Sequence, residues 1–168
     1  MTLHDQLVAI RACSDAVEWV GTRTIEQAWT ACERGDWMLW LAGRIDIDRK
    51  LLVSAACACA EPALAFVRAG EDRPRLAIEV ARAWCVGTAT LDDVRAAAYA
   101  AYAAYAAAYA VYAAYDDAYA AAYAAYDDAY AAAYAAYDAA RKESLKKSAD
   151  ICREILTEEV LQKYKNKR

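Results

Sequence analysis

An alanine- and tyrosine-rich stretch between Tyr99 and Tyr137 constrains the fold of this chain more than any other feature. Within it, the residues of 115–125 recur without change in 126–136. This eleven-residue period equals three helical turns of about 3.67 residues, which suits a nearly straight or slightly right-handed helix. The stretch contains neither glycine nor proline, and alanine is the best helix former. The sequence therefore predicts one very long helix.

The tyrosines of this stretch fall on one face of the predicted helix. At roughly 100° per residue, those of a single repeat lie within about 80° of one another. The stripe consists of Tyr99, Tyr102, Tyr105, Tyr109, Tyr112, Tyr115, Tyr119, Tyr123, Tyr126, Tyr130, Tyr134 and Tyr137. A bundle formed by residues 1–90 is too small to cover so many rings, and an exposed aromatic stripe marks an interaction surface. We therefore expect a homo-oligomer that assembles through this helix. Binding of another protein and folding back onto the chain's own domain are the alternatives.

Paired aspartates at 116–117 and 127–128 share the same repeat and lie about 16 Å apart along the helix axis. A ladder of metal sites or mimicry of a nucleic acid would use such an arrangement. Neighbouring residues on a helix point about 100° apart, however, so the two carboxylates of a pair share a ligand poorly. We interpret the pairs as groups that solvate an otherwise apolar helix.

The net charge of −4 is unevenly distributed along the chain. It is −2 over residues 1–90, −6 over 91–140 and +4 over 141–168. Basic residues at a helix C-terminus stabilise the helix dipole, so we interpret the positive end in that way and do not expect nucleic-acid binding.

The chain begins without the basic and apolar segments of a signal peptide, and the tyrosines are unsuited to hydrocarbon. We expect a cytoplasmic protein without a membrane contact.

Capping and helix-breaking residues predict an all-α protein with two domains. A compact multi-helix bundle is expected over 1–90, and a very long helix over 91–168, which can bend near 141–144. Candidate caps are Ser14, Thr24 with Gln27, Asp36, Asp46 or Asp48, and Thr90 with Asp93; Pro62 and Pro74 fit first turns, and Gly21 and Gly87 fit helix ends.

Two segments stand out as candidate core. The small residues of 54–60 permit close approach of other helices, so we expect this helix to be the most enclosed one of the bundle. Near the C-terminus the alanine tract gives way to a conventional aliphatic stripe. Its members are Leu145, Ile151, Ile155, Val160 and Leu161.

The residue types that carry catalysis or hold a cofactor are sparse. His4 is the single histidine, and the six cysteines form no CxxC pair, so a zinc site would need thiolates at unusual spacings. We expect buried free thiols in a reducing compartment, no metal, no cofactor and no enzymatic activity.

Three strings of the first half resemble a known family. They are Trp29 to Leu41 (WTACERGDWMLWL), Asp48 to Leu52 (DRKLL) followed by the small-residue helix, and Gly70 to Arg75 (GEDRPR) with the nearby Ala77-Ile78-Glu79. Followed by an alanine- and tyrosine-rich tail, they resemble the Imm-5-like immunity proteins of bacteria and phages over roughly residues 11–114. The resemblance implies an α-helical cytosolic protein that neutralises a toxin or effector by binding it. A structural protein that forms a coiled-coil-like oligomer or filament through the tyrosine stripe is the alternative.

Polar residues on one predicted loop are the candidate partner-binding site: Glu71, Asp72, Arg73 and Arg75. Loops beside helix starts often carry recognition residues, although a capped turn with local ion pairs gives the same pattern. Trp29, Trp37 and Trp40 are expected to pack in the core rather than to stack on a ligand. The tripeptide at 34–36 is expected to serve helix capping rather than adhesion.

Overall fold

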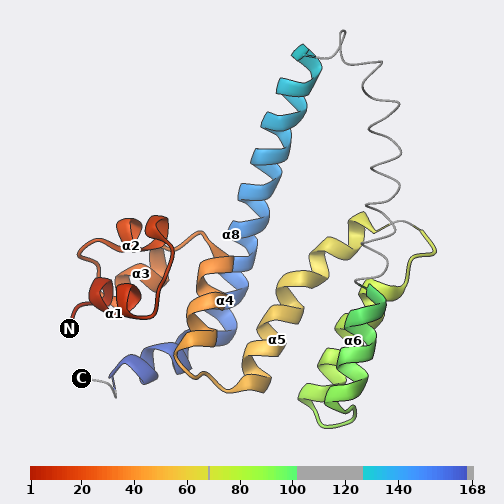
Figure 1. The fold of residues 1–168 in the computed structure, drawn as a ribbon, viewed down its shortest axis with the longest axis horizontal. Helices are drawn as coiled ribbons and strands as arrows, with labels where there is room; N and C mark the ends of the chain where they lie inside the picture. Colours follow the sequence, from red (N-terminus) through yellow and green to blue (C-terminus); the bar gives the residue numbers. More distant parts are fainter. Residues whose placement is uncertain (68, 102–126, 166–168) are drawn as a thin grey trace. The chain divides into compact units, whose positions relative to one another are not determined.

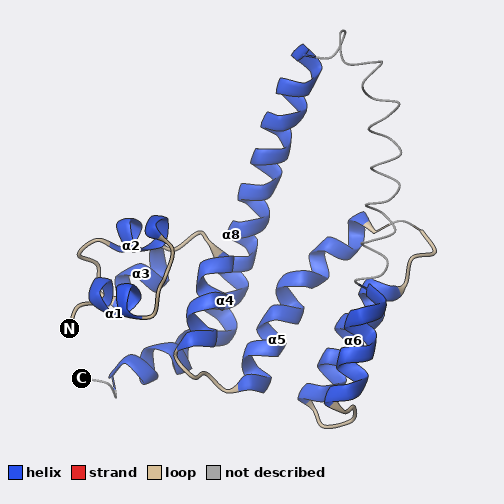
Figure 2. Ribbon diagram, viewed as in Figure 1, coloured by secondary structure: helices blue, strands red, loops and turns tan. Residues whose placement is uncertain are grey.

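The computed structural model describes residues 1–67, 69–101 and 127–165, with the side chains of residues 66 and 127–137 outside that description. Every regular element in these residues is a helix, which confirms the predicted all-α class (Figures 1 and 2). The chain divides into two compact units. Unit 1 joins Met1–Cys59 to Ser144–Arg168, and unit 2 is Ala60–Glu143. These units do not coincide with the predicted domains 1–90 and 91–168, because the end of the long C-terminal helix shares a core with the N-terminal helices.

Unit 1 consists of four short N-terminal helices, most of a fifth, and the last part of the C-terminal helix (Figure 1). Their bounds are α1 (Leu3–Ala9), α2 (Ser14–Val20), α3 (Ile25–Ala31), α4 (Gly35–Arg44), α5 (Arg49–Ala60) and α8 (Asp127–Lys165). Helix α8 is continuous across 141–144, where the sequence allowed a bend. That place coincides with the boundary between the two units.

Several predicted helix ends are confirmed. Thr24 and Gln27 form a capping box at α3, and Thr90 exchanges the same pair of hydrogen bonds with Asp93. Asp48 accepts a hydrogen bond from the Leu51 amide at the start of α5, and Gly21 ends α2 with a positive φ of 51°. In each case a short polar side chain, or a residue without Cβ, satisfies a local requirement of the helix end.

Two predicted caps are wrong. Ser14 is the first residue of α2, and Cys13 stands at the cap position without a side-chain hydrogen bond. Asp36 lies inside the first turn of α4, because the helix already begins at Gly35. The Asp36 carboxylate instead pairs with Arg34, at 2.6 Å between Nη2 and Oδ2. Whether a residue caps a helix depends on its position relative to the first helical residue, and the sequence predicts that first residue only approximately.

Helix α5 is not the most enclosed helix among the described residues, so this expectation is wrong. Only Ala55 and Cys57 of α5 are buried. The buried line of α8 consists of Ala149, Cys152, Leu156, Val160 and Tyr164. Of the predicted aliphatic stripe, Val160 alone belongs to this line, and the other four residues are half-buried beside it. Ala149, Cys152 and Tyr164 do not stand out in the sequence, because the hydrophobicity of a side chain does not reveal how closely α4 approaches α8.

Polar contacts also tie α8 into unit 1. The indole nitrogen of Trp29 donates to Thr157 Oγ1 at 2.9 Å, and Glu159 accepts from the Asp48 amide at 2.9 Å. Arg153 donates to the carbonyl of Cys32, just past the end of α3, where carbonyls lack helical partners. The last part of α8 is therefore an integral part of unit 1, and the role of its basic residues as a counter-charge to the helix dipole stays a prediction.

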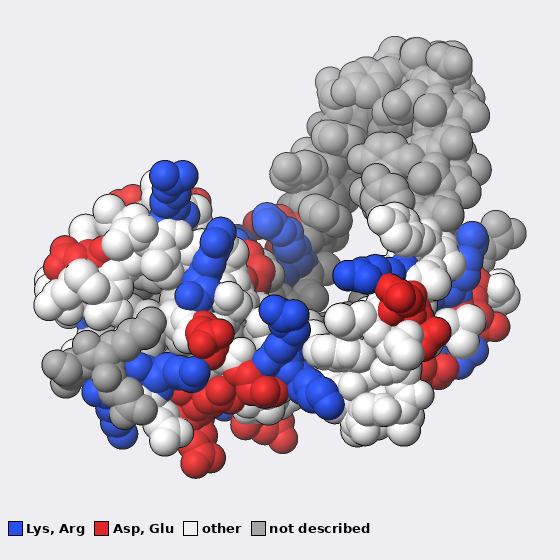
Figure 3. Space-filling view, turned by 60° about the horizontal axis from the view of Figure 1, so that its bottom comes forward, with Lys and Arg blue, Asp and Glu red and all other residues white. Residues whose placement is uncertain are grey.

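Unit 2 contains a 3₁₀ helix, η1 (Glu61–Phe66), helix α6 (Arg73–Cys85), a helical segment over 91–101 and the beginning of α8. Pro62 and Pro74 occupy first turns, as predicted. Arg82 of α6 pairs with Glu61 of η1, at 2.8 Å between nitrogen and oxygen. On the face shown in Figure 3, acidic and basic side chains are interspersed within each unit rather than gathered by sign.

Candidate functional site

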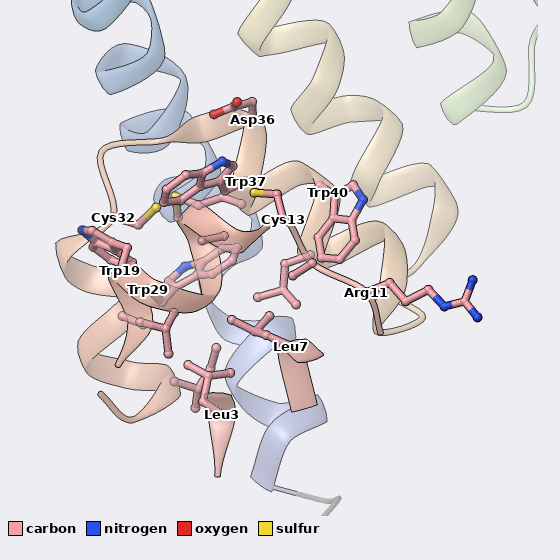
Figure 4. Close-up of a pocket in the computed structure, with 17 residues that line it drawn as sticks. Leu3, Leu7, Arg11, Cys13, Trp19, Trp29, Cys32, Asp36, Trp37 and Trp40 are labelled. Carbon is pink, nitrogen blue, oxygen red and sulfur yellow. The ribbon is translucent and has the colours of Figure 1, made fainter. Parts of the chain in front are cut away.

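Unit 1 contains an apolar pocket of about 500 Å³ between its first four helices (Figure 4). Its lining residues are Leu3, Leu7, Arg11, Ala12, Cys13, Ala16, Trp19, Val20, Ile25, Ala28, Trp29, Cys32, Asp36, Trp37, Met38, Trp40 and Leu41. Nine of them are buried, so the floor of the pocket is also the core of the bundle. A volume of several hundred Å³ with mostly apolar walls is typical of ligand and side-chain recognition sites.

Four tryptophans from three helices form much of the wall. Trp19 comes from α2, Trp29 from α3, and Trp37 and Trp40 from α4 (Figure 4). Trp19 and Trp37 meet edge to face, with ring centroids 6.1 Å apart and planes at 61°. This arrangement is favoured by the ring quadrupoles. Trp29 is buried, which confirms its expected core role, whereas Trp37 and Trp40 are half-buried and contribute to the pocket.

Each half-buried tryptophan of the pocket carries an arginine over its ring. The guanidinium carbon lies 4.9 Å from the ring centroid for Arg23 on Trp19, 4.3 Å for Arg34 on Trp37 and 5.3 Å for Arg44 on Trp40. Such stacking contributes about 0.5–1 kcal/mol at exposed sites. The charged residues that line the pocket itself are Arg11 and Asp36, one of each sign.

The charged side chains that line the pocket either have an ion-pair partner or point away from the tryptophans. Hydrogen bonds from Arg34 lower the pKa of Asp36 below its usual value, which keeps this carboxylate ionised. Burial raises the pKa of the Cys32 thiol, so the part of the pocket wall formed by Cys32 stays uncharged. The Arg11 side chain points away from the tryptophans (Figure 4). The interior of the pocket is thus apolar and its charges lie at the edge.

The predicted partner-binding residues lie in unit 2 and pair among themselves. Arg73 hydrogen-bonds to the Glu71 carboxylate, which lowers the Glu71 pKa to about 2. Arg75 pairs with Asp72 at 3.1 Å and with Glu79 at 2.6 Å. The structure brings these residues together as local ion pairs at the start of α6, and their role towards a partner stays a prediction.

The tyrosine stripe falls mostly outside the described residues. Tyr102 to Tyr126 are not described. For Tyr130, Tyr134 and Tyr137, the structure describes the helical backbone but not the side chains. Tyr99 is described and is 76% exposed. Self-association through the stripe therefore stays a prediction, with one exposed ring at its beginning.

Sequence reasoning missed the pocket as a site. Its contributions come from four separate helices, and only their packing brings Leu3, Trp19 and Trp40 around one hollow. A signal was present, because four of the five tryptophans lie between residues 19 and 40. Core packing is the expected role of three of these tryptophans, ahead of stacking on a ligand.

Within the described part of the chain, no group of three or more His, Cys, Asp and Glu side chains is placed to hold a metal ion. A search of the same residues for a helix that is both long and apolar enough to cross a membrane finds none. Comparison with family models, with curated proteins and with solved structures gave no match to the chain.

Proposed function

We propose that this chain is a non-enzymatic helical binding protein of the immunity type, which neutralises a toxin or effector through protein–protein contact. The observation that carries the proposal is the tryptophan-walled pocket of unit 1. The resemblance of residues 11–114 to Imm-5-like proteins supports the same class of function.

The pocket suits an apolar anchor side chain of a protein partner. Binding energy at protein interfaces concentrates where aromatic and arginine side chains surround a desolvated hollow, and Trp and Arg are enriched at such positions. Trp19, Trp37 and Trp40 provide the aromatic surface, and the arginines stacked on them flank it. Charged residues beside the anchor would meet Arg11 and Asp36 at the edge of the pocket, which orients the partner.

Binding to the products of the genes that flank its own tests the proposal. Each product is titrated into the intact chain by calorimetry, and one of them is expected to bind. Ala12→Phe, which adds a ring at a half-buried residue that lines the pocket, is expected to weaken that binding at least 10-fold. Arg73→Glu, at the charged loop of unit 2, is the matched variant and should leave binding nearly unchanged.

The opposite pattern, in which Arg73→Glu abolishes binding and Ala12→Phe does not, would move the site to the loop of residues 71–75. Circular-dichroism melting of both variants establishes that each is folded. Binding by none of the neighbouring products would contradict the proposed function itself.

A further inference from the structure

Two cysteines from distant parts of the sequence face each other in unit 1. Cys59 lies at the end of α5 and Cys152 lies on α8, with their Sγ atoms 3.9 Å apart. Cys59 Sγ also lies 3.6 Å from the Ser148 carbonyl, and Cys152 Sγ lies 3.8 Å from the Gly35 carbonyl. Neither residue lines the pocket.

The two thiols differ in access and in acidity. Cys59 is half-buried, whereas Cys152 is fully buried. The contact with the Cys152 thiol lowers the pKa of Cys59 to about 7. The same contact, together with burial, raises the pKa of Cys152. Since the thiolate is the nucleophile and Cys59 is the more accessible of the two sulfurs, Cys59 is the reactive member of the pair.

We propose that Cys59 and Cys152 form a redox-active pair that a hydroperoxide oxidises to an intramolecular disulfide. The Cys59 thiolate attacks the peroxide, the O–O bond breaks, and a sulfenic acid forms as hydroxide leaves and is protonated to water. Cys152 Sγ then attacks Cys59 Sγ. An S–S bond forms as the S–O bond breaks, and the thiol proton leaves with the hydroxide as a second water. Two thiols thus give two electrons to one hydrogen peroxide, which yields one disulfide and two waters.

The geometry requires little rearrangement. A disulfide needs its sulfurs about 2.05 Å apart, so the two Sγ atoms must approach by roughly 2 Å. Cys59 is the penultimate residue of α5, where a helix end gives way more easily than its middle. Cys152 already points at Cys59 from the neighbouring helix.

The position of the pair in the chain gives the bond a structural consequence. Cys59 is the last residue of the first segment of unit 1, and Cys152 lies in the second segment. A bond between them would join the two segments covalently and close a loop that contains residues 60–143. Because a cross-link over a long loop restricts the unfolded chain strongly, oxidation should stabilise unit 1.

Thiol counting on the full-length chain tests the proposal. The reduced protein has six thiols, and stoichiometric hydrogen peroxide is expected to leave four. Peptide mapping without reductant should then find the Cys59 peptide joined to the Cys152 peptide. The denaturation midpoint should rise on oxidation and return to its original value after treatment with dithiothreitol.

Matched variants identify the pair. Cys13→Ser, at an exposed cysteine, should lose two thiols as the parent does, whereas Cys59→Ser should lose none. The mapping on the unaltered chain stands even if a variant folds poorly. A count that stays at six, a cross-link between other cysteines, or oxidation of Cys59 to sulfinic acid without an S–S bond would overturn the proposal.

Discussion

At the scale of single residues, burial in this chain alters the chemistry of side chains that the sequence marks as ordinary. Tyr164 is the clearest case, since it belongs to the buried line of α8 and is only 7% exposed. Burial disfavours the phenolate and raises the pKa of Tyr164 to about 12, from an ordinary value of 10. The thirteen tyrosines of the chain are thus not equivalent, because their settings differ.

The raised pKa of Tyr164 predicts a loss of stability at alkaline pH. The folded pKa lies above the unfolded one, so the stabilisation is complete below pH 10 and is lost as the pH rises through 10 to 12. Full ionisation would cost about 2–3 kcal/mol. The free energy of unfolding of Tyr164→Phe should therefore fall less than that of the parent across this range, measured by tryptophan fluorescence. Tyr99→Phe, at an exposed tyrosine, is the control; parallel curves for parent and Tyr164→Phe would contradict the argument.

At the scale of helices, unit 1 depends on a close approach of α4 to α8. Gly35 stands at the beginning of α4 and is buried against Ser148 and Ala149. A Cβ at this position would lie 2.6 Å from the Ser148 carbonyl carbon and 2.7 Å from the Ala149 nitrogen, both main-chain atoms. The glycine of the tripeptide at 34–36 therefore serves helix packing, and not the helix capping that was expected of that motif.

Gly35→Ala is expected to destabilise unit 1 by about 1–3 kcal/mol or more, because main-chain atoms cannot yield without moving α8. Gly43→Ala is a matched control on the same helix. Its new Cβ would meet Leu52 at an ordinary 3.6 Å, and replacing a helical glycine by alanine gains up to about 1 kcal/mol. Denaturant midpoints of the two variants should move in opposite directions. Equal shifts would show that α4 and α8 are not packed as described.

At the scale of the whole molecule, unit 1 is built from the two ends of the chain and unit 2 from the middle. The core of unit 1 is incomplete without α8, which supplies Ala149, Cys152, Leu156, Val160 and Tyr164. Residues 1–90 therefore lack part of the core that the first four helices require, although the sequence suggested that they form a bundle alone.

Removing the middle should leave unit 1 folded, whereas removing the end should not. In the first variant, residues 60–143 are replaced by about eight Gly and Ser residues, which is long enough because Cys59 contacts Ser148 and residue 144 lies only about 6 Å further along the helix. This chain should unfold cooperatively in urea. A chain ending at residue 143 should show no cooperative transition of its N-terminal tryptophans. Cooperative unfolding of the second variant would contradict the discontinuous unit 1.

The sequence by itself determined the helical class, the long C-terminal helix and several helix ends. Periodicity, alanine content and short capping side chains act over one or two turns, as at Thr24 and Gln27. Tertiary structure decided which helices share a core and which side chains line the pocket. Burial of Cys152, the contact of Gly35 with α8 and the convergence of four tryptophans each depend on chain segments distant in sequence. No local pattern encodes such distances, because they follow from how complete helices pack together.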